Sequence, residues 1–527
     1  MLVDCGCSFP DPSQVGVSTI IPDFEYLREN TEKIRGLVIT HAHEDHISGI
    51  PYLVREFDIP IYASHFAIEV IKTKLEDCNQ TTCGVKFVEI NPCSTVELGC
   101  FKTEFIHVNH SIPEAMALAI TTPEGIVVHT GDFRIDLTPT GGQAPTDIAR
   151  FSRLGEMGVK CLVCESTNAE RPGYSLSENE VVKTLDTLFL KNKSRRLIIS
   201  TFASNINRIK SIIEVAVKHH RKIAFTGRSM EKLVGIAKKE KYINFRNDSL
   251  IDIYTASELP PEKVVIITTG SQGEVMSALQ RMSTGEHRDV SLNNHDVVIL
   301  SASTIPGNEK MVSKVVNALV KNGIETIRHP QELLHVSGHA HQEEIKLLYT
   351  FLQPEYYIPC HGETVHLHAN AKIAESMGHR PEDIVIPSLG SVIEIDDKGI
   401  RVTGQVQAGA VLIEGYSISD MSQSVFTERR ILAQNGMIVV VIEISKRLKT
   451  VTGEPDIISK GFACSKDSSE LIFNIKKIAK QAALANITVN EVNWKAIKKA
   501  VKESVGSYVS EKVKRSPMII PIIVSVR

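Results

Sequence analysis

Residues 40–46, which read Thr-His-Ala-His-Glu-Asp-His, constrain this chain of 527 residues more than any other stretch. They directly follow a short apolar run, residues 36–40, that is typical of a buried strand. Three histidines and an aspartate within six residues cannot all point to one side of a regular element, because side chains alternate on a strand and turn by about 100° per residue on a helix. On a loop the same residues can surround metal ions. Imidazole and carboxylate are ligands that zinc accepts, so the sequence predicts a metal site here.

Four further polar residues stand where apolar, strand-like runs end, namely His110, Asp132, Glu165 and His361. Open α/β sheets place their ligand sites at the carboxyl ends of strands. Each of these residues taken singly is more typical of a satisfied polar group than of a ligand. Together with the motif at residues 41–46, however, His110, Asp132 and His361 complete two metal sites.

Strands and helices alternate regularly between about residues 177 and 336. We expect strands at 197–201, 222–226, 264–268 and 297–301, and helices near 207–217, 230–239, 274–282 and 309–320. This alternation predicts a parallel sheet covered by helices. Three of the strands lead into small polar loops that can present N–H groups and hydroxyls to phosphate. Serine, threonine and glycine are also ordinary caps and turn formers.

The C-terminal hundred residues form a separate basic unit. A boundary is expected near residues 424–430, followed by strands at 437–444 and 518–526 and by helices at 468–484 and 492–505. Residues 431–527 carry 16 Lys and Arg against 8 Asp and Glu, whereas the whole chain has a net charge of −3. Such a unit suits either a polyanion partner or a solvated helix face at Lys498, Lys499 and Lys502.

Composition excludes several classes of protein. Hydrophobic residues make up 42% and charged residues 23%, as in ordinary globular proteins, which excludes disorder and collagen-like order. The longest apolar runs are far shorter than the roughly 20 residues of a membrane-spanning helix, so we expect no membrane association. The sequence shows no signal peptide.

The ten cysteines do not form the pattern of a disulfide scaffold. Cys5, Cys161 and Cys164 lie in apolar stretches, and we expect buried thiols there. The four cysteines at residues 78–100 are irregularly spaced, and this spacing suits free thiols better than a structural zinc site. A reducing cytoplasm fits this usage best.

Taken together, these features resemble the metallo-β-lactamase fold with a β-CASP insert, and within that branch the bacterial ribonuclease J family. The resembling segments run along the whole chain, at residues 9–11, 17–23, 41–53, 129–133, 225–230, 303–309, 335–341 and 515–521. The resemblance implies an α/β protein: an αββα sandwich, an inserted parallel-sheet domain and a small α/β C-terminal domain. The expected boundaries are 1–176 and 337–427 for the two parts of the sandwich, 177–336 for the insert and 428–527 for the last domain.

The resemblance also implies a ligand set. His41, His43 and His110 would hold one zinc ion, and Asp45, His46 and His361 a second, with Asp132 bridging them. Two Zn²⁺ per subunit are expected, with Mn²⁺ or Mg²⁺ as alternatives. Asp4 would orient a ligand histidine without binding metal itself.

By the same resemblance the activity is that of a 5′→3′ exoribonuclease with endonuclease activity, in messenger decay and ribosomal RNA maturation. A hydroxide held at the two metals would attack the phosphodiester. Asp45 would position or deprotonate the water. His339 would act as general acid or phosphate contact, with Glu165 holding its imidazole. A buried histidine bonded to Glu165 without a chemical role is the alternative for His339.

Backbone phosphates would be bound by six residues: Ser303, Thr304, Ser337, His339, His341 and Arg228. Arg228 suits an ordinary surface residue equally well. The expected partners are single-stranded RNA with a 5′-monophosphate, a second copy bound through the C-terminal domain as homodimer or homotetramer, and other RNA-decay proteins. The expected location is the cytoplasm.

Three other functions are alternatives to this one. The long insert and the basic C-terminal domain argue against a hydrolase of small esters or thioesters. All seven ligand positions are filled, which argues against a non-catalytic RNA-binding subunit. The C-terminal resemblance argues against a DNA-repair nuclease.

The resembling family has an additional strand pair and a glycine-rich loop before the strand that ends at Asp4. We therefore expect the given start to lie inside the gene product. Without those strands, an edge of the first sheet would be exposed.

Overall fold

The computed structural model describes residues 1–11, 13–244, 247–274, 276–305, 307–415, 417–418, 423–462, 468–487 and 493–526. The chain divides into two compact units. The first comprises Met1–Cys7 and Ile21–Ala410, and the second comprises Ser8–Ile20 and Val411–Arg527.

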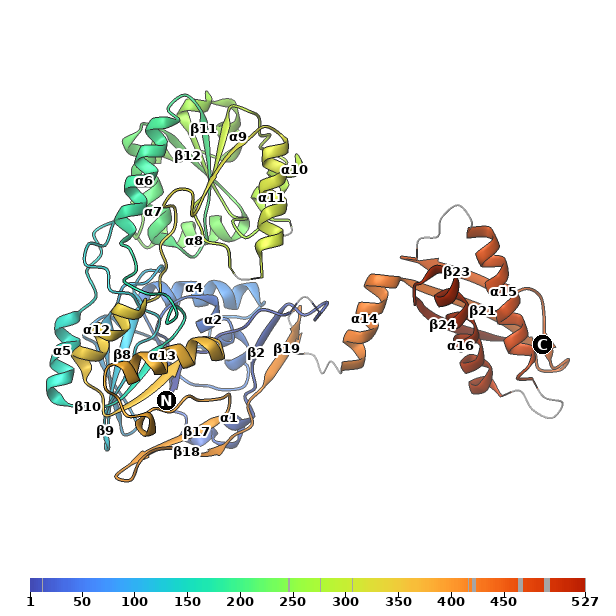
Figure 1. Cartoon of the computed structure of the whole chain (residues 1–527), viewed down its shortest axis with the longest axis horizontal. Helices are drawn as coiled ribbons and strands as arrows, with labels where there is room; N and C mark the ends of the chain where they lie inside the picture. Colours follow the sequence, from blue (N-terminus) through green and yellow to red (C-terminus); the bar gives the residue numbers. More distant parts are fainter. Residues whose placement is uncertain are drawn as a thin grey trace. The chain divides into compact units, whose positions relative to one another are not determined.

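A sandwich of two β-sheets forms the base of the first unit (Figure 1). The smaller sheet is parallel and has the order β1 (Leu2–Val3), β3 (Leu37–Val38), β4 (Ile61–Ala63) and β5 (Phe87–Glu89). The larger sheet has the order β16 (Tyr356–Cys360), β10 (Val159–Glu165), β9 (Gly125–His129), β8 (Met116–Thr122), β7 (Phe101–His107) and β6 (Thr95–Leu98). Val38, Phe105 and Leu118 belong to the apolar core between the sheets.

Helices cover the outer face of the six-stranded sheet. They are α5 (Ile148–Met157), α12 (Gln342–Leu352) and α13 (Thr364–Ser376). Their apolar sides share one core with this sheet, which includes Phe151, Leu348 and Tyr357. On the other sheet lies α4 (His65–Asp77), which contacts the short helix α3 (Ile50–Leu53). Two further short helices, α1 (Glu25–Glu29) and α2 (Glu44–Ile47), precede α3 in the chain. The layers confirm the predicted αββα sandwich.

The inserted domain is a parallel sheet of five strands with helices on both faces (Figure 1). Its strand order is β12 (Lys222–Thr226), β13 (Val264–Thr268), β11 (Arg196–Ser200), β14 (Asp296–Leu300) and β15 (Glu325–Arg328). Its helices are α6 (Glu178–Lys191), α7 (Ile206–Lys218), α8 (Arg228–Lys239), α9 (Ile253–Glu258), α10 (Ala278–Thr284) and α11 (Glu309–Lys321). The predicted parallel sheet is therefore confirmed.

One predicted helix of this domain, at residues 274–282, begins later than expected. Met276 has a φ of +66°, which a right-handed helix cannot include. Ser277 then caps α10, because its hydroxyl accepts a hydrogen bond from the backbone N–H of Gln280.

In the second unit, α15 (Ser468–Leu484) and α16 (Trp494–Val513) pack on one face of a sheet of β21 (Met437–Ser445), β22 (Thr450–Val451), β23 (Asp456–Lys460) and β24 (Met518–Val526). The last predicted helix was expected to end at Val505 but continues to Val513. Its buried stripe extends to Val509, and this packing outweighs the low helix propensity of Gly506.

The remaining elements are β2 (Thr19–Pro22), the hairpin of β17 (Ser391–Asp396) and β18 (Gly399–Gln405), β19 (Ala410–Glu414), β20 (Ser417–Ile418) and α14 (Gln423–Asn435). Among the residues described, no helix is both long and apolar enough to cross a membrane.

Candidate metal centre

The histidine motif lies just beyond the carboxyl end of β3. His41 and His43 are on the loop, and the one-turn helix α2 carries Asp45 and His46. The segment after β1 holds this helix in place, because the backbone N–H of Cys5 donates to the carbonyl oxygen of His46 (2.8 Å). Gly6 makes the approach possible, since a Cβ atom there would lie 1.6 Å from the carbonyl oxygen of Asp45.

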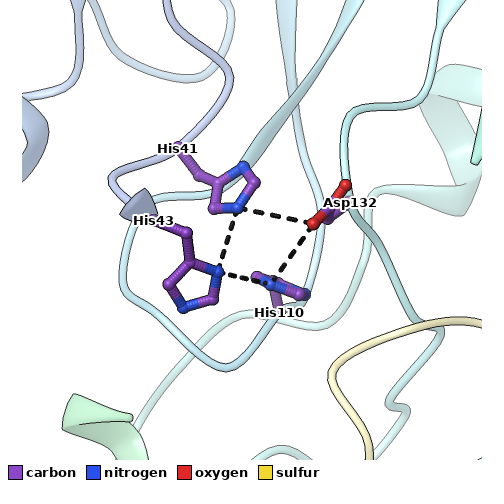
Figure 2. A group of neighbouring side chains, drawn as sticks. All are labelled: His41, His43, His110 and Asp132. Atoms are coloured by element: carbon purple, nitrogen blue, oxygen red, sulfur yellow. Dashed lines mark hydrogen bonds and ion pairs between the residues drawn. The ribbon is translucent and has the colours of Figure 1, made fainter. Parts of the chain in front are cut away.

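Four side chains converge in a first cluster, His41, His43, His110 and Asp132 (Figure 2). His43 Nδ1 lies 3.1 Å from His41 Nε2 and 3.0 Å from His110 Nε2. Asp132 Oδ2 lies 3.6 Å from His41 Nε2 and 3.8 Å from His110 Nε2. These residues come from three different strand ends, those of β3, β7 and β9.

A second cluster shares the same aspartate oxygen. Asp132 Oδ2 lies 3.4 Å from both His46 Nε2 and His361 Nε2. Asp45 Oδ2 lies 3.8 Å from His46 Nε2 and 3.9 Å from His361 Nε2. His361 follows β16, so that both clusters lie along one edge of the sandwich.

Both clusters have the chemistry and spacing of metal sites. A tetrahedral zinc ion with bonds of about 2.1 Å keeps its ligand atoms roughly 3.4 Å apart, close to the separations above. His46 Nε2 and Asp132 Oδ1 are buried and make no hydrogen bond. Buried polar atoms are otherwise almost always paired, so these residues fit zinc.

The electrostatics of the first cluster favour neutral imidazoles. Burial lowers the pKa of His41 and of His110 well below the usual value, and lowers that of His43 to about 4. Neutral imidazole is the form that binds metal.

The pKa values of His46 and Asp132 are instead set by their charged neighbours. Burial opposes the charged form of His46, but Asp132 and Asp4 outweigh it and raise its pKa well above the usual value. Burial likewise opposes ionisation of Asp132, yet His46 and His361 hold its pKa well below the usual range.

Asp4 fixes the ring of His46 from behind. Its Oδ2 lies 2.7 Å from His46 Nδ1 and accepts a hydrogen bond from the Thr40 hydroxyl (2.8 Å). Its Oδ1 accepts a hydrogen bond from the Thr40 backbone N–H (2.8 Å). Nε2 of His46 is thereby turned toward Asp132.

His110 has a comparable support that has no signal in the sequence. His110 Nδ1 donates to the carbonyl oxygen of Gly338 (2.7 Å), which leaves Nε2 for the cluster. A Cβ atom at residue 338 would lie 2.8 Å from the His110 ring, so only glycine fits. Ser111 Oγ also lies 3.3 Å from His43 Nε2. No spacing rule links residue 338 to residue 110, because their contact is made by the fold.

His339 and Glu165 lie beside the clusters. His339 Nδ1 is 3.0 Å from Glu165 Oε2 and 3.8 Å from Asp132 Oδ2. Burial opposes the charged form of His339, but the charge and hydrogen bond of Glu165 outweigh it and raise its pKa to about 9. Glu165 is itself held by the backbone N–H of Phe133, which donates to Oε1 (3.0 Å).

The six predicted phosphate contacts are spread over two places. Ser337 lies beside His339, whose backbone N–H donates to its hydroxyl oxygen (3.2 Å). His341 is the N-cap residue of α12, where its N–H donates to Glu344 (2.9 Å), and its Nδ1 is buried without a hydrogen bond. Ser303 and Thr304 follow β14, and the exposed Arg228 follows β12, so these three lie at the carboxyl edge of the inserted sheet.

Nine cysteines lie among the residues that the structure describes. Cys5, Cys161 and Cys164 are buried free thiols, as predicted. The four thiols at residues 78–100 are free, and none of the candidate metal clusters among the described residues includes a cysteine.

A two-sheet sandwich with a histidine–aspartate centre at its strand ends, interrupted by a parallel-sheet domain, defines a metallo-hydrolase of the metallo-β-lactamase superfamily with a β-CASP insert. Residues 1–147 match the beta-lactamase superfamily domain, residues 194–319 the ribonuclease J beta-CASP domain, residues 329–387 the Zn-dependent metallo-hydrolase RNA specificity domain, and residues 424–526 the ribonuclease J C-terminal domain. The chain belongs to the ribonuclease J family.

Relatives match along the whole chain. Ribonuclease J of Mycolicibacterium smegmatis is 39% identical over 528 residues, which cover 100% of this chain and 93% of that protein. Ribonuclease J2 of Bacillus subtilis is 35% identical over 526 residues, covering 100% and 94%. Ribonuclease J of Synechocystis is 37% identical over 530 residues, covering 99% and 82%. The chain is thus a metal-dependent ribonuclease, as the resemblance implied.

Proposed function

We propose that this ribonuclease uses two metal ions to degrade single-stranded RNA from a 5′-monophosphate end and also to cut internally. The observation that carries the proposal is the position of Asp132 Oδ2, which lies 3.4–3.8 Å from four imidazole nitrogens of two clusters. A carboxylate shared in this way suits a bridging ligand between two ions.

The first ion would be held by His41, His43 and His110, the second by Asp45, His46 and His361, and both by Asp132. Zn²⁺ is the expected metal, with Mn²⁺ or Mg²⁺ as alternatives. When bound, the two ions would activate a water molecule and offset the negative charge of the phosphate.

The chain's own groups supply the proton transfers. The Asp45 side chain is 46% exposed, so it can reach the attacking water and accept its proton. His339 keeps Nδ1 on Glu165, so that its Nε2–H would donate a proton to the 3′ oxygen as that oxygen leaves phosphorus. Its pKa of about 9 supports the acid role, because the imidazole is charged at neutral pH.

Ser303, Thr304, Ser337, His341 and Arg228 would contact backbone phosphates. Their hydroxyl, imidazole and guanidinium groups can all donate hydrogen bonds to phosphate oxygens. The exposed loop and helix start that carry Ser303, Thr304 and Arg228 would guide the strand toward Ser337 and His339.

The decisive experiment follows an internally labelled RNA with a 5′-monophosphate at nucleotide resolution. Metal-loaded wild-type protein is compared with the double variant His43→Ala, Asp45→Ala and with His295→Ala, which removes an exposed histidine far from the motif in sequence. We expect mononucleotides from the wild type and the control, and none from the double variant. A 5′-triphosphate RNA and a circular RNA test end dependence and internal cleavage. Equal rates on 5′-monophosphate and 5′-triphosphate ends would refute the end-dependent mode.

In the cell we propose action in messenger decay and ribosomal RNA maturation in the cytoplasm, with other RNA-decay proteins as partners.

We also propose self-association as homodimer or homotetramer through the C-terminal domain. Ile458, Ile522 and Val524 are exposed on the sheet face opposite α15 and α16, since they pair with Val439, Val441 and Glu443 while the alternate residues of β21 are buried. An apolar sheet face of this kind supports an interface.

Sedimentation of the full chain tests this interface. Ile522→Asp is expected to lower the mass by half or more, whereas Val392→Asp, on the exposed hairpin strand β17, leaves it unchanged. An unchanged mass for Ile522→Asp would place the interface elsewhere.

A further inference from the structure

The loop between β7 and β8, residues 108–115, connects the metal cluster to the inserted domain. His110 near its start points into the first cluster. Glu114 near its end binds two groups outside the loop. Its Oε2 accepts the backbone N–H of Phe66 (2.9 Å), and its Oε1 accepts the hydroxyl of Tyr242 (2.6 Å).

Glu114 holds a backbone conformation that is unusual for its type. Its φ is +60°, in the left-handed region that residues with a Cβ atom rarely adopt. Such a conformation persists when the surrounding structure determines it, and it is enriched at functional sites. Here the two hydrogen bonds of the Glu114 carboxylate hold the backbone in this conformation.

Tyr242 belongs to the inserted domain, just beyond α8. Its ring packs edge-on against Phe66 at a centroid distance of 5.1 Å, and Phe66 is fully buried in the first turn of α4. Ion pairs nearby join α4 to the C-terminal end of α8 and the residue after it. They are Lys239–Glu69 (2.9 Å) and His65–Glu240 (2.8 Å). The inserted domain is therefore docked on α4 at the point where Glu114 is bound.

The inserted domain also reaches the other end of the loop. Asn207 of α7 donates through Nδ2 to the carbonyl oxygen of His110 (3.2 Å). The loop is thus held at His110 by α7 and at Glu114 by the segment after α8, with Ile112 buried between them. A candidate metal ligand of the sandwich therefore lies on a loop held at both ends by another domain.

We propose that Glu114 and Tyr242 are positioning residues for the hydrolysis. They fix the loop that carries His110, so that the cluster of His41, His43, His110 and Asp132 holds its metal at full affinity only when the inserted domain is docked. This inference rests on the proposed assignment of His110 as a metal ligand. Groups that hydrogen-bond directly to a metal ligand are worth about 10–100-fold in metal affinity or activity. Because Glu114 and Tyr242 act through the loop, we expect an effect at the lower end of that range.

Zinc binding to the full chain tests the proposal directly. Each protein is equilibrated with buffered Zn²⁺ and its bound zinc is counted, and the Co²⁺-loaded forms are compared by their absorption spectra. Tyr242→Phe removes only the hydroxyl and is expected to weaken one of the two zinc sites about 10-fold. Glu114→Ala also removes the acceptor of the Phe66 N–H and is expected to weaken that site at least as much. The double variant is expected to match Glu114→Ala, because that change already removes the contact that Tyr242→Phe breaks.

Kinetics and two matched variants separate positioning from general stability. Tyr242→Phe is expected to lower kcat with KM unchanged. Glu114→Gln keeps an acceptor for Phe66 N–H and an amide that donates to the Tyr242 oxygen, so it is expected to restore most of the zinc affinity. Tyr254→Phe, at an exposed tyrosine of α9, is the control and is expected to match the wild type.

His110→Ala separates the assignment of the metal site from the positioning role of Glu114 and Tyr242. If His110→Ala binds zinc like the wild type, the assignment of the metal site itself fails. If His110→Ala loses one zinc ion while Tyr242→Phe and Glu114→Ala keep wild-type affinity and spectra, the positioning role is wrong and the proposed function stands.

Discussion

The imidazole of His339 faces both carboxylate oxygens of Glu165: Nδ1 lies 3.0 Å from Oε2 and 3.2 Å from Oε1. Glu165 is almost fully buried, at 1% exposure, so this carboxylate has little competition from water. The pair links the end of β10 to the segment that leads back from the inserted domain.

Replacing Glu165 by Gln should lower the pKa of His339 from its value of about 9, because the negative charge that holds the proton is removed. A group with a raised pKa stays charged up to that pH, so the wild-type rate should fall only as the pH rises through it. In Glu165→Gln this alkaline limb of kcat should move to lower pH, with a loss of about 10²-fold at pH 8. Glu375→Gln, on the exposed side of α13, is the control. An unmoved limb would mean that His339 does not supply the proton.

Replacing Asp132 by Asn should remove metal from both sites at once. The oxygen shared by the two clusters loses its charge, while the side-chain shape is retained. We expect less than one metal ion per chain by elemental analysis, and a loss of activity of more than about 100-fold. Loss of a single ion with the second retained at full occupancy would contradict the bridging position of Asp132.

Metal binding should release protons at pH 7. Without metal, His46 is protonated at this pH because its pKa lies well above the usual value, and Nε2 must lose its proton to bind an ion. Affinity at this cluster should therefore rise with pH and fall as the solution is acidified. The His41–His43–His110 cluster should change little from pH 7 to pH 5, since the pKa of His43 is about 4. Titration calorimetry in buffers of different ionisation enthalpy measures the protons released, and none released at pH 7 would contradict the assignment.

Removing Arg208 should strongly destabilise the inserted domain. Arg208 is fully buried, where it bonds both oxygens of Glu178, the hydroxyl of Ser301 (2.8 Å) and the carbonyl oxygen of Leu334 (2.6 Å). Arg208→Met leaves the Glu178 charge buried and unpaired, which costs about 3–5 kcal/mol. The double variant Arg208→Met, Glu178→Leu should cost clearly less than the sum of the single changes. Urea denaturation checks this, and strictly additive losses would show that the two side chains do not act as a pair.

Much of the fold could be predicted because its signals are local. The alternation of apolar strands and amphipathic helices in the inserted domain is visible within short stretches of sequence. β12 and β13 accordingly fall at the predicted residues. The start of α10 could not be predicted, because Met276 adopts a left-handed conformation that no periodicity reports. The end of α16 was missed for a related reason, since packing of Val509 decided it rather than propensity.

The sequence by itself determined the chemistry of this protein. Residues 41–46 predict metal ligands, and the polar residues after three other strands predict where more candidate ligands come from. Only the tertiary structure decided how these groups are held. Gly338 contacts His110, and Tyr242 binds Glu114 on the same loop, both from distant parts of the chain. Nothing in the local sequence of either residue indicates its partner. Ligand type is a property of single residues, whereas ligand orientation depends on contacts between segments that only folding brings together.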